Sequence, residues 1–213
     1  MKNNILKIVF LLALTSSVLT SCVKEDDFDI PVLREVFFLE NFESIEDANT
    51  GNNQFISLDG WSNVSLNGGS ERWEARMFSN NKYAQLSAFG TGETNMDTWL
   101  ISPAINLDET KNEALSFLYK AAFHNGNAIS VLISEDYDGS NTASAINSAT
   151  WTDLEVSFPD FLTSGYPNDF SNTGSINISS YNGNVHIAIR YVGSSSGIST
   201  TYQIDDIKLY ENN

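Results

Sequence analysis

The side chains that could do chemistry in this chain are mainly carboxylates. The sequence has 27 acidic residues, two histidines and one cysteine. His124 and His186 lie far apart, with no cysteine or acidic pattern beside either, so we expect exposed strand residues and no metal ligand or catalytic base. The sequence contains no G-x-S-x-G motif of a serine hydrolase, no H-E-x-x-H motif of a zinc protease and no phosphate-binding loop.

Paired carboxylates hydrolyse glycosidic bonds when they lie roughly 5–10 Å apart. Glu71 and Glu74 come nearest to such a pair in sequence. Residues three apart on a strand point to opposite faces, which argues against this pair. Asp97 could be a catalytic acid, but its place just before Trp99 favours a turn residue that hydrogen-bonds the backbone. We therefore predict no catalytic residue and no enzyme, and keep an extracellular hydrolase only as a third alternative.

The charge of the chain limits its partners. Acidic residues outnumber the 11 basic ones, and the formal net charge is −16. Such a surface repels phosphates, so we predict no nucleic-acid partner.

Residues 1–21 have the order of a secretory signal peptide. Lys2 and Lys7 precede an apolar run at 8–14, and small polar residues follow it. The run is shorter than the roughly 20 residues that a membrane-spanning helix needs. Residues 19–22 (LTSC) resemble the lipobox of bacterial lipoproteins, which implies cleavage before Cys22 and acylation of its sulfur. The membrane would then be a partner through this lipid anchor, whereas the alternative is a free or buried cysteine.

The residues after the cysteine suggest where the protein is located in the cell. Lys24, Glu25, Asp26 and Asp27 resemble the surface-export signal of Bacteroidetes lipoproteins. The resemblance implies a protein anchored in the outer membrane and facing the cell exterior, and the alternative is an ordinary solvated linker. Residues 22–35 show no strand or helix period, so we expect an acidic tether.

Residues 36–213 are predicted to form one all-β domain, an antiparallel sandwich. Short aromatic or β-branched segments alternate with Asn, Gly and Ser clusters, which is typical of that class. One short helix is expected at 142–149, and a long surface loop at 159–174. The predicted strands are 36–42, 72–78, 83–89, 98–107, 114–123, 128–134, 151–158, 175–181, 185–193 and 201–210.

Five segments together resemble the choice-of-anchor J or cleaved-adhesin type of domain. They are 41–43 (NFE), 60–61 (GW), 97–103 (DTWLISP), 114–117 (ALSF) and 204–207 (IDDI). The resemblance spans about residues 36–211. It implies a jelly roll that is related in fold to MAM and galactose-binding-like modules.

The resemblance also implies a structural calcium ion that joins the first and last strands. Glu43 and Asp205 match the positions of its carboxylates, and a main-chain carbonyl near Asn41 would be a third ligand. Asp206 and Glu40 are weaker candidates, because neighbours on a strand point to opposite faces. The alternative is that Glu43 and Asp205 cap strands and face water.

Aromatic side chains are the candidates for ligand contact, since a sugar ring can stack on a flat face. Trp61 and Trp73 flank a polar loop in 59–72, and Tyr166 lies in the loop 159–174. Loops at the ends of a sandwich commonly build its binding sites. Trp99, Phe117 and Trp151 are instead expected in the core.

Two functions remain open at this point. The first is a non-catalytic outer-membrane surface lipoprotein that binds a glycan or a cell-surface protein as an adhesion or capture module. The second is a structural or accessory subunit of an outer-membrane assembly that binds no sugar. An exposed aromatic strip lined by Asn and Asp favours the first, and a large contiguous apolar patch favours the second.

Overall fold

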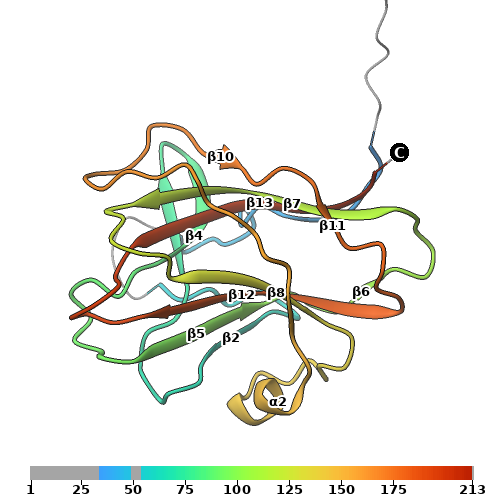
Figure 1. The fold of residues 1–213 in the computed structure, drawn as a ribbon, viewed down its shortest axis with the longest axis horizontal. Helices are drawn as coiled ribbons and strands as arrows, with labels where there is room; N and C mark the ends of the chain where they lie inside the picture. The colour runs from blue at the N-terminus through green and yellow to red at the C-terminus, as the bar shows by residue number, and fades with distance from the viewer. Residues whose placement is uncertain (1–33, 49–53, 213) are drawn as a thin grey trace, which may run out of the picture. The chain divides into compact units, whose positions relative to one another are not determined.

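Two antiparallel β-sheets face each other in a computed structural model of the protein, which describes residues 34–48 and 54–212 (Figure 1). The first sheet comprises β1 (Val36–Glu40), β3 (Glu74–Phe78), β4 (Asn81–Leu86), β7 (Glu113–Ala122), β10 (Ser171–Asn172), β11 (Ile176–Asn177) and β13 (Thr201–Glu211). The second sheet comprises β2 (Ser62–Ser65), β5 (Met96–Ile101), β6 (Ile105–Asn106), β8 (Ile129–Ser134), β9 (Thr152–Asp153) and β12 (Asn184–Gly193). The predicted all-β jelly-roll sandwich is confirmed.

The strand β13 lies at the centre of the first sheet. It pairs with β7 along one edge, and on its other edge it pairs first with β4 and then with β1. The second sheet has the order β2-β5-β12-β8-β9, with β6 also beside β12. Figure 1 shows the long strands β7 and β13 in one layer and β12, β8 and β5 in the other.

The core fills the space between the sheets by strand alternation. Val185, Ile187 and Ile189 of β12 point into the main core, while Ala188 between them faces the other side. In β13 the inward residues are Tyr202 and Ile204, and then Ile207 and Leu209. The inward-facing residues have even numbers before this point and odd numbers after it, so the strand must contain one extra residue between Ile204 and Ile207. The register against β7 shifts at the same place, between Asp205 and Lys208. Asp206 lies there with φ of 50°, so this is a β-bulge.

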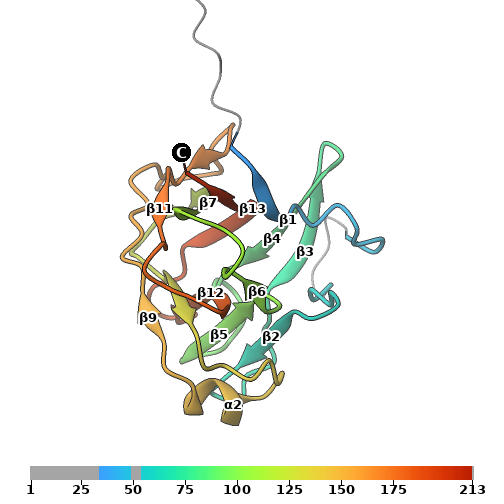
Figure 2. The ribbon, with the colours of Figure 1, turned by 90° about the vertical axis from the view of Figure 1, so that its right-hand side faces the viewer.

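The helix α2 (Ala143–Ser148) confirms the predicted helix at 142–149. The Thr142 side chain accepts a hydrogen bond from the backbone N–H of Ala145 and so caps its first turn. Ile146 is buried in a second apolar cluster with Trp99 and Ile101. This cluster covers the outer face of the second sheet, where α2 lies in both views (Figures 1 and 2).

Two predicted strands are much shorter than expected. In the segment 151–158 only Thr152–Asp153 pairs, because Glu155 has φ of 52° and turns the backbone out of the extended region. In the segment 175–181 only Ile176–Asn177 pairs, and the Asn177 side chain then accepts a hydrogen bond from the N–H of Ser179 in an Asx turn. The segment Ser62–Ser65 forms strand β2, although its polar sequence predicted a loop.

Asp97 is not the predicted turn residue. It lies within β5, and its carboxylate accepts hydrogen bonds from Arg190 Nε at 2.8 Å and from an Arg190 terminal nitrogen at 2.7 Å. It also accepts one from Trp99 Nε1 at 2.8 Å. The pairing of β5 with β12 brings these side chains together, which local sequence could not indicate.

Neither histidine is the exposed strand residue that the sequence predicted. His186 lies in β12 but is buried, and its Nδ1 is 2.8 Å from the carbonyl oxygen of Ser102. His124 lies in a loop after β7 and stacks on Phe161 with ring centroids 3.9 Å apart. His186 is thus in a strand but not exposed, and His124 is not in a strand.

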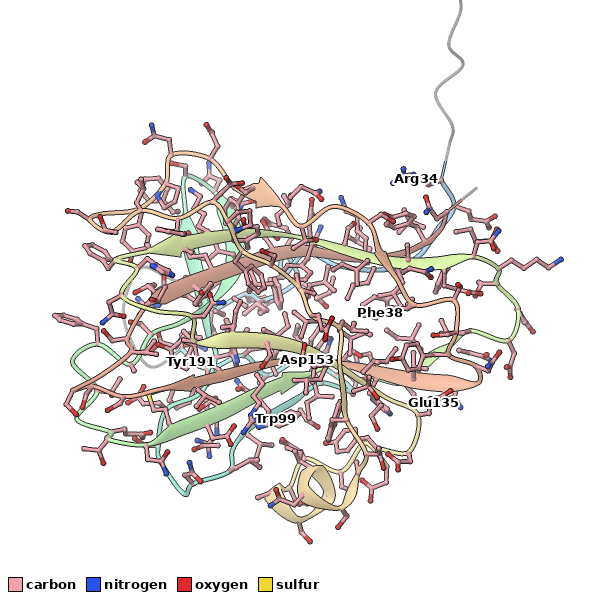
Figure 3. The ribbon with its side chains drawn as sticks, in the orientation of Figure 1. Arg34, Phe38, Trp99, Glu135, Asp153 and Tyr191 are labelled. Atoms are coloured by element: carbon pink, nitrogen blue, oxygen red, sulfur yellow. The ribbon has the colours of Figure 1, made fainter. Side chains whose placement is uncertain are left out.

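Trp73 belongs to the core and not to a binding rim, so its prediction as a ligand contact was wrong. The side chain is fully buried. Its ring packs edge-on against the ring of Tyr191, with the two centroids 6.5 Å apart. Tyr191 lies between the sheets (Figure 3). Its backbone N–H also donates to the Asn63 side chain, which ties it to β2. Trp99 and Phe117 are buried as predicted, and Trp151 is half-buried against Trp99.

The predicted signal peptide, Cys22 and Lys24–Asp27 lie outside the described residues. At the start of the described chain, Arg34 donates a hydrogen bond to the Tyr210 hydroxyl. Within residues 34–48 and 54–212, no helix is long and apolar enough to cross a membrane.

We expect Trp73→Ala to lower the free energy of unfolding by about 3–5 kcal/mol, since it removes a large side chain from the core. Phe89→Ala is the matched control, because Phe89 is 80% exposed and its loss should cost at most about 0.5 kcal/mol. Urea unfolding followed by tryptophan fluorescence and circular dichroism measures both. Equal costs for the two substitutions would contradict the placement of Trp73.

Candidate binding groove on the first sheet

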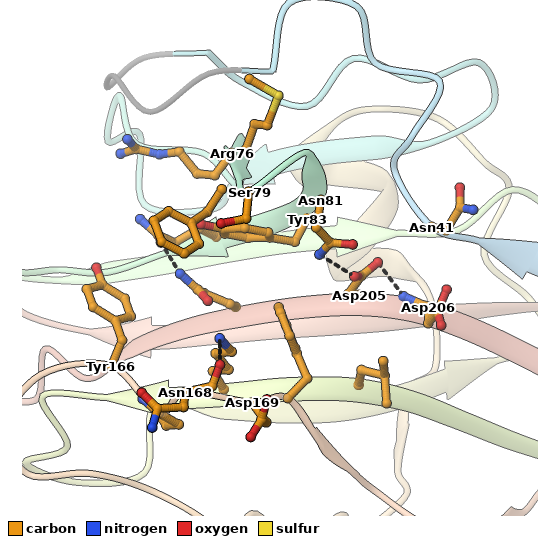
Figure 4. Close-up of a pocket in the computed structure, with 18 of the residues that line it drawn as sticks. Asn41, Arg76, Ser79, Asn81, Tyr83, Tyr166, Asn168, Asp169, Asp205 and Asp206 are labelled. Carbon is orange, nitrogen blue, oxygen red and sulfur yellow. Dashed lines mark hydrogen bonds between the residues drawn. The ribbon is translucent and has the colours of Figure 1, made fainter.

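Two adjoining cavities lie on the outer face of the first sheet. Their volumes are about 780 and 680 Å³, and both are lined by Arg76, Gln85 and Tyr166. Because they share these residues, the two cavities form one elongated groove, hereafter the outer groove. Figure 4 shows the larger cavity.

The floor of the outer groove is made by residues that alternate with the core residues of four strands. Arg76 comes from β3, Tyr83 and Gln85 from β4, Gln203 from β13 and Lys120 from β7. Gln203 is opposite both Gln85 and Lys120 in the strand pairing. Its Nε2 donates to Gln85 Oε1 at 2.9 Å, so a row of amides crosses the sheet.

The loop 159–174 forms one wall. Phe170 meets Tyr83 edge-on at 5.8 Å, and Lys120 Nζ lies 4.7 Å from the Phe170 ring centroid. Lys120 also donates to the Asn168 carbonyl oxygen at 3.0 Å. Tyr166 lies over the junction of the two cavities and packs edge-on against Phe123 at 5.3 Å. Most of the predicted surface loop is exposed, but Ser171–Asn172 within it pairs with β7 as strand β10. Ligand binding by Tyr166 stays a prediction.

The hairpin between β3 and β4 forms the opposite wall. Ser79 and Asn80 both have positive φ, of 52° and 65°, as a two-residue type I′ turn requires. The turn brings Phe78 and Asn81 to the cavity. Asparagine tolerates this left-handed conformation better than most residues, so the local sequence suits the turn.

Large aromatic side chains at the edge of the outer groove are open to solvent. Phe78 is 69% exposed and Phe89 80%, while Phe123 and Tyr166 are nearly half exposed. All four line the groove. Flat apolar faces therefore border a polar floor.

One end of the outer groove gathers the residues predicted to bind calcium. Asn41, Glu43, Asp205 and Asp206 all line the larger cavity. Asp205 accepts hydrogen bonds from Asn81 Nδ2 at 2.9 Å and from the Asp206 N–H at 2.7 Å (Figure 4). Glu43 accepts one from the Lys82 N–H at 3.0 Å, and Asn41 one from the Glu43 N–H at 3.3 Å.

Burial raises the pKa of the Asp205 carboxyl, and the nearby carboxylates of Asp206 and Glu43 raise it further, against the hydrogen bonds from Asn81 and Asp206. The expectation that Asp205 and Asp206 point to opposite faces was wrong, because the bulge in β13 interrupts the alternation. Glu40 instead accepts a hydrogen bond from the Phe42 N–H and does not line the groove.

No three His, Cys, Asp or Glu side chains gather as a metal-binding group in the part of the chain that the structure describes. The carboxylates of Glu43 and Asp205 and the amide of Asn41 line the acidic end of the outer groove, and each accepts a hydrogen bond from the protein. The third carboxylate there, that of Asp206, pairs with Lys208 at 3.1 Å. The calcium ion therefore stays a prediction.

The other end of the outer groove is lined by Glu71 and Glu74. Strand alternation predicted opposite faces for them, which was wrong because β3 begins only at Glu74 and Glu71 belongs to the preceding loop. Glu74 forms an ion pair with Arg76. Burial raises the pKa of Glu71, and the carboxylates of Glu93 and Glu74 add to the effect.

Trp61, the remaining ligand candidate, lines neither cavity. It is half-buried, and its ring packs against Phe38 and Phe42 with centroid distances of 6.4 and 6.1 Å. Of the polar loop 59–72, only Glu71 reaches the outer groove. Sequence reasoning missed Tyr83, Gln85, Gln203 and Phe170. Their signal was weak, since outward residues of any strand alternate in the same way.

Residues 81–211 match a family described as a domain of unknown function, DUF5017. The chain belongs to the DUF5017 family. The match covers β4, β7, β13 and the loop 159–174, and so most of the outer groove, while β3 lies before it. A search of curated proteins gave no match.

Several solved structures resemble this DUF5017 domain in fold. The K2 cleaved adhesin domain of Lys-gingipain matches with a TM-score of 0.56 and 16% identity, over 83% of this chain and 98% of that one. The K3 domain from Porphyromonas gingivalis matches with a TM-score of 0.51 and 15% identity, over 84% and 100% of the two chains. At this identity the comparison establishes the fold alone. It confirms the cleaved-adhesin part of the predicted resemblance at that level, and the choice-of-anchor J part stays a prediction.

Proposed function

We propose that the protein is a non-catalytic module that binds an extended glycan chain along the outer groove. The observation that carries the proposal is the combination of exposed aromatic faces with a floor of amides and carboxylates in one continuous groove. Sugar rings have apolar faces and hydroxyl edges, so they match both parts. Concave sites with a few placed polar groups are typical of small-molecule and carbohydrate ligands.

The polar floor favours a glycan over a protein partner. The centre of a protein–protein interface is depleted in charged residues. Here the groove has the Gln85–Gln203 pair on its floor and the Glu74–Arg76 ion pair towards one end. The alternative function, an accessory subunit that binds no sugar, has less support because the exposed aromatic residues stand around this polar floor.

The proposal of a non-catalytic role rests on the side chains that face the outer groove. Its carboxylates are engaged by the protein: Glu74 pairs with Arg76 and Asp206 with Lys208, while Asp205 accepts a hydrogen bond from Asn81. Neither histidine lines the groove. The groove therefore offers hydrogen bonds and stacking surfaces, and its chemistry is that of a binding site.

Tyr166→Ala should weaken glycan binding by about tenfold or more, since Tyr166 lines both halves of the groove and a central aromatic contact commonly contributes over 1 kcal/mol. Phe161→Ala is the control, because Phe161 is similarly exposed in the same loop but lines neither cavity. A glycan array with residues 23–213 identifies a ligand, and calorimetric titration compares the variants. Equal affinity in Tyr166→Ala would place the glycan elsewhere, and an array without hits would favour the accessory-subunit alternative.

We further propose that the module is attached to the outer membrane by acylated Cys22 and exported to the cell exterior by Lys24-Glu25-Asp26-Asp27. The support is the sequence order of charged, apolar and small residues before the cysteine, and the acidic residues after it. A glycan-binding groove on the cell exterior would meet polysaccharides that cannot cross the membrane.

Replacing residues 24–27 with alanine should abolish antibody labelling of whole cells while the protein remains in the membrane fraction. Cys22→Ser should instead release the protein from membranes, because its anchor is lost. Immunoblots of cell fractions provide the control for expression. Unchanged surface labelling after the four substitutions would disprove the export signal.

We also propose that a calcium ion can bind at the acidic end of the outer groove, held by the Glu43 and Asp205 carboxylates and an oxygen of Asn41. The donor types fit, since calcium prefers carboxylate and amide oxygens. Asp205 is 5% exposed and close to two further carboxylates, so a cation would offset its unfavourable burial. The ion would stabilise the contact between the segment after β1 and the bulge in β13.

Calcium at 100 times its dissociation constant should raise the melting temperature by roughly 5–10 °C relative to EDTA, the effect of about 2.7 kcal/mol on a domain of this size. Asp205→Asn should abolish this shift. In EDTA at pH 7 it should be no less stable than the parent, because the raised pKa means that folding disfavours the ionised carboxylate. Glu46→Gln, an exposed carboxylate outside the groove, is the control. A parent protein that melts equally in calcium and EDTA would refute the site.

A further inference from the structure

The basic side chains of the outer groove are already engaged by the protein. Arg76 pairs with Glu74, and each side chain is only 11% exposed. Lys120 donates to the Asn168 carbonyl oxygen and lies over the Phe170 ring, where Asp169 interacts with its charge. These are the two basic residues among the described residues that line the groove. The charge of Arg76 is therefore neutralised within the protein, and that of Lys120 is partly offset by Asp169 and the Phe170 ring.

Carboxylates, in contrast, are distributed along the whole outer groove. Six acidic side chains line it, at both ends and on the wall loop: Glu43, Glu71, Glu74, Asp169, Asp205 and Asp206. Glu43 and Asp169 are exposed. When no calcium ion is bound at the acidic end, a carboxylate or sulfate on a bound chain would lie among these like charges, while the net charge of −16 repels the same ligand at longer range.

Hydrogen-bond chemistry favours the same ligand class. Ionised Asp and Glu side chains only accept hydrogen bonds, whereas the side-chain amides of Gln85, Gln203, Asn81 and Asn168 both donate and accept. A sugar hydroxyl can donate to the carboxylates and exchange hydrogen bonds with the amides. A ligand carboxylate has no donor to offer the acidic residues.

We infer that the outer groove selects uncharged, hydroxyl-rich glycan chains and excludes acidic ones such as uronates and sulfated chains. The inference rests on the proposed function and adds the chemical class of the ligand. Loss of acidic charge from the groove then relaxes this selectivity.

The test uses residues 23–213 in affinity electrophoresis. The neutral polysaccharides are β-glucan, mannan and galactan, and the acidic ones are polygalacturonate, alginate and heparin. The polysaccharide that binds best among the neutral ones is then compared with the same polymer after oxidation of its primary alcohols to carboxylates. This pair differs in charge while its linkages are preserved.

All binding is measured in EDTA, so that no calcium ion held by Glu43 and Asp205 contributes to the charge of the groove. We expect the neutral polymer to bind at least tenfold more tightly than its oxidised form at low salt. The double variant Glu43→Gln/Asp169→Asn should reduce this ratio severalfold, as should 0.5 M salt, because screening shortens the range of the repulsion. The control is Glu46→Gln/Asp160→Asn, which removes two carboxylates outside the groove and should keep the ratio of the parent.

Three outcomes would count against these proposals in different ways. Equal or tighter binding of the acidic polymers would overturn the selectivity and leave the glycan-binding function intact. A preference for the neutral polymer that responds neither to salt nor to the double variant would also overturn it, since shape and not charge would be the cause. Binding of no polysaccharide, neutral or acidic, would overturn the proposed function itself.

Discussion

The bulge in β13 is the constraint on which the rest of the first sheet depends. Tyr202 and Ile204 on one side of it, and Ile207 and Leu209 on the other, must all face the core, which two-residue alternation alone does not allow. One extra residue at Asp205–Asp206 resolves the conflict. Without the bulge, either Ile207 and Leu209 or Tyr202 and Ile204 would face water.

The same bulge decides what meets at the acidic end of the outer groove. The partner of β13 changes from β4 to β1 at this point, since β4 pairs with residues 202–204 and β1 with 207–210. The segment after β1 and the start of β4 therefore lie beside the bulge, and they bring Glu43 and Asn81 to Asp205. Core packing thus places two adjacent carboxylates on the outer face, where their mutual repulsion is unfavourable. Lys208 offsets part of it through its ion pair with Asp206 at 3.1 Å, and Asn81 donates a hydrogen bond to Asp205.

The two outer faces of the sandwich differ in the way that matters for function. On the second sheet, α2 and the cluster around Trp99 cover much of the outer face, and Arg190 and Asp97 pair beside it. On the first sheet, the loop 159–174 stands at the side as a wall and leaves the amide row across β4 and β13 within a groove. The proposed ligand accordingly lies on the first sheet, and its long axis follows the two adjoining cavities.

The sequence by itself determined the all-β class, the principal strands, the short helix capped by Thr142 and the exposed loop with Tyr166, because each has a local signal in alternation, capping or composition. Only the tertiary structure decided that Trp73 is core, that His186 is buried, that Asp97 pairs with Arg190, and that Asp205 and Asp206 share one face. Alternation tells which residues lie on the same side of a strand. It does not tell which side will be covered by the rest of the protein, or where a β-bulge adds a residue and reverses the alternation. These outcomes depend on strands far apart in the chain that must close around one core, as when Gln203 meets Gln85 across 118 positions.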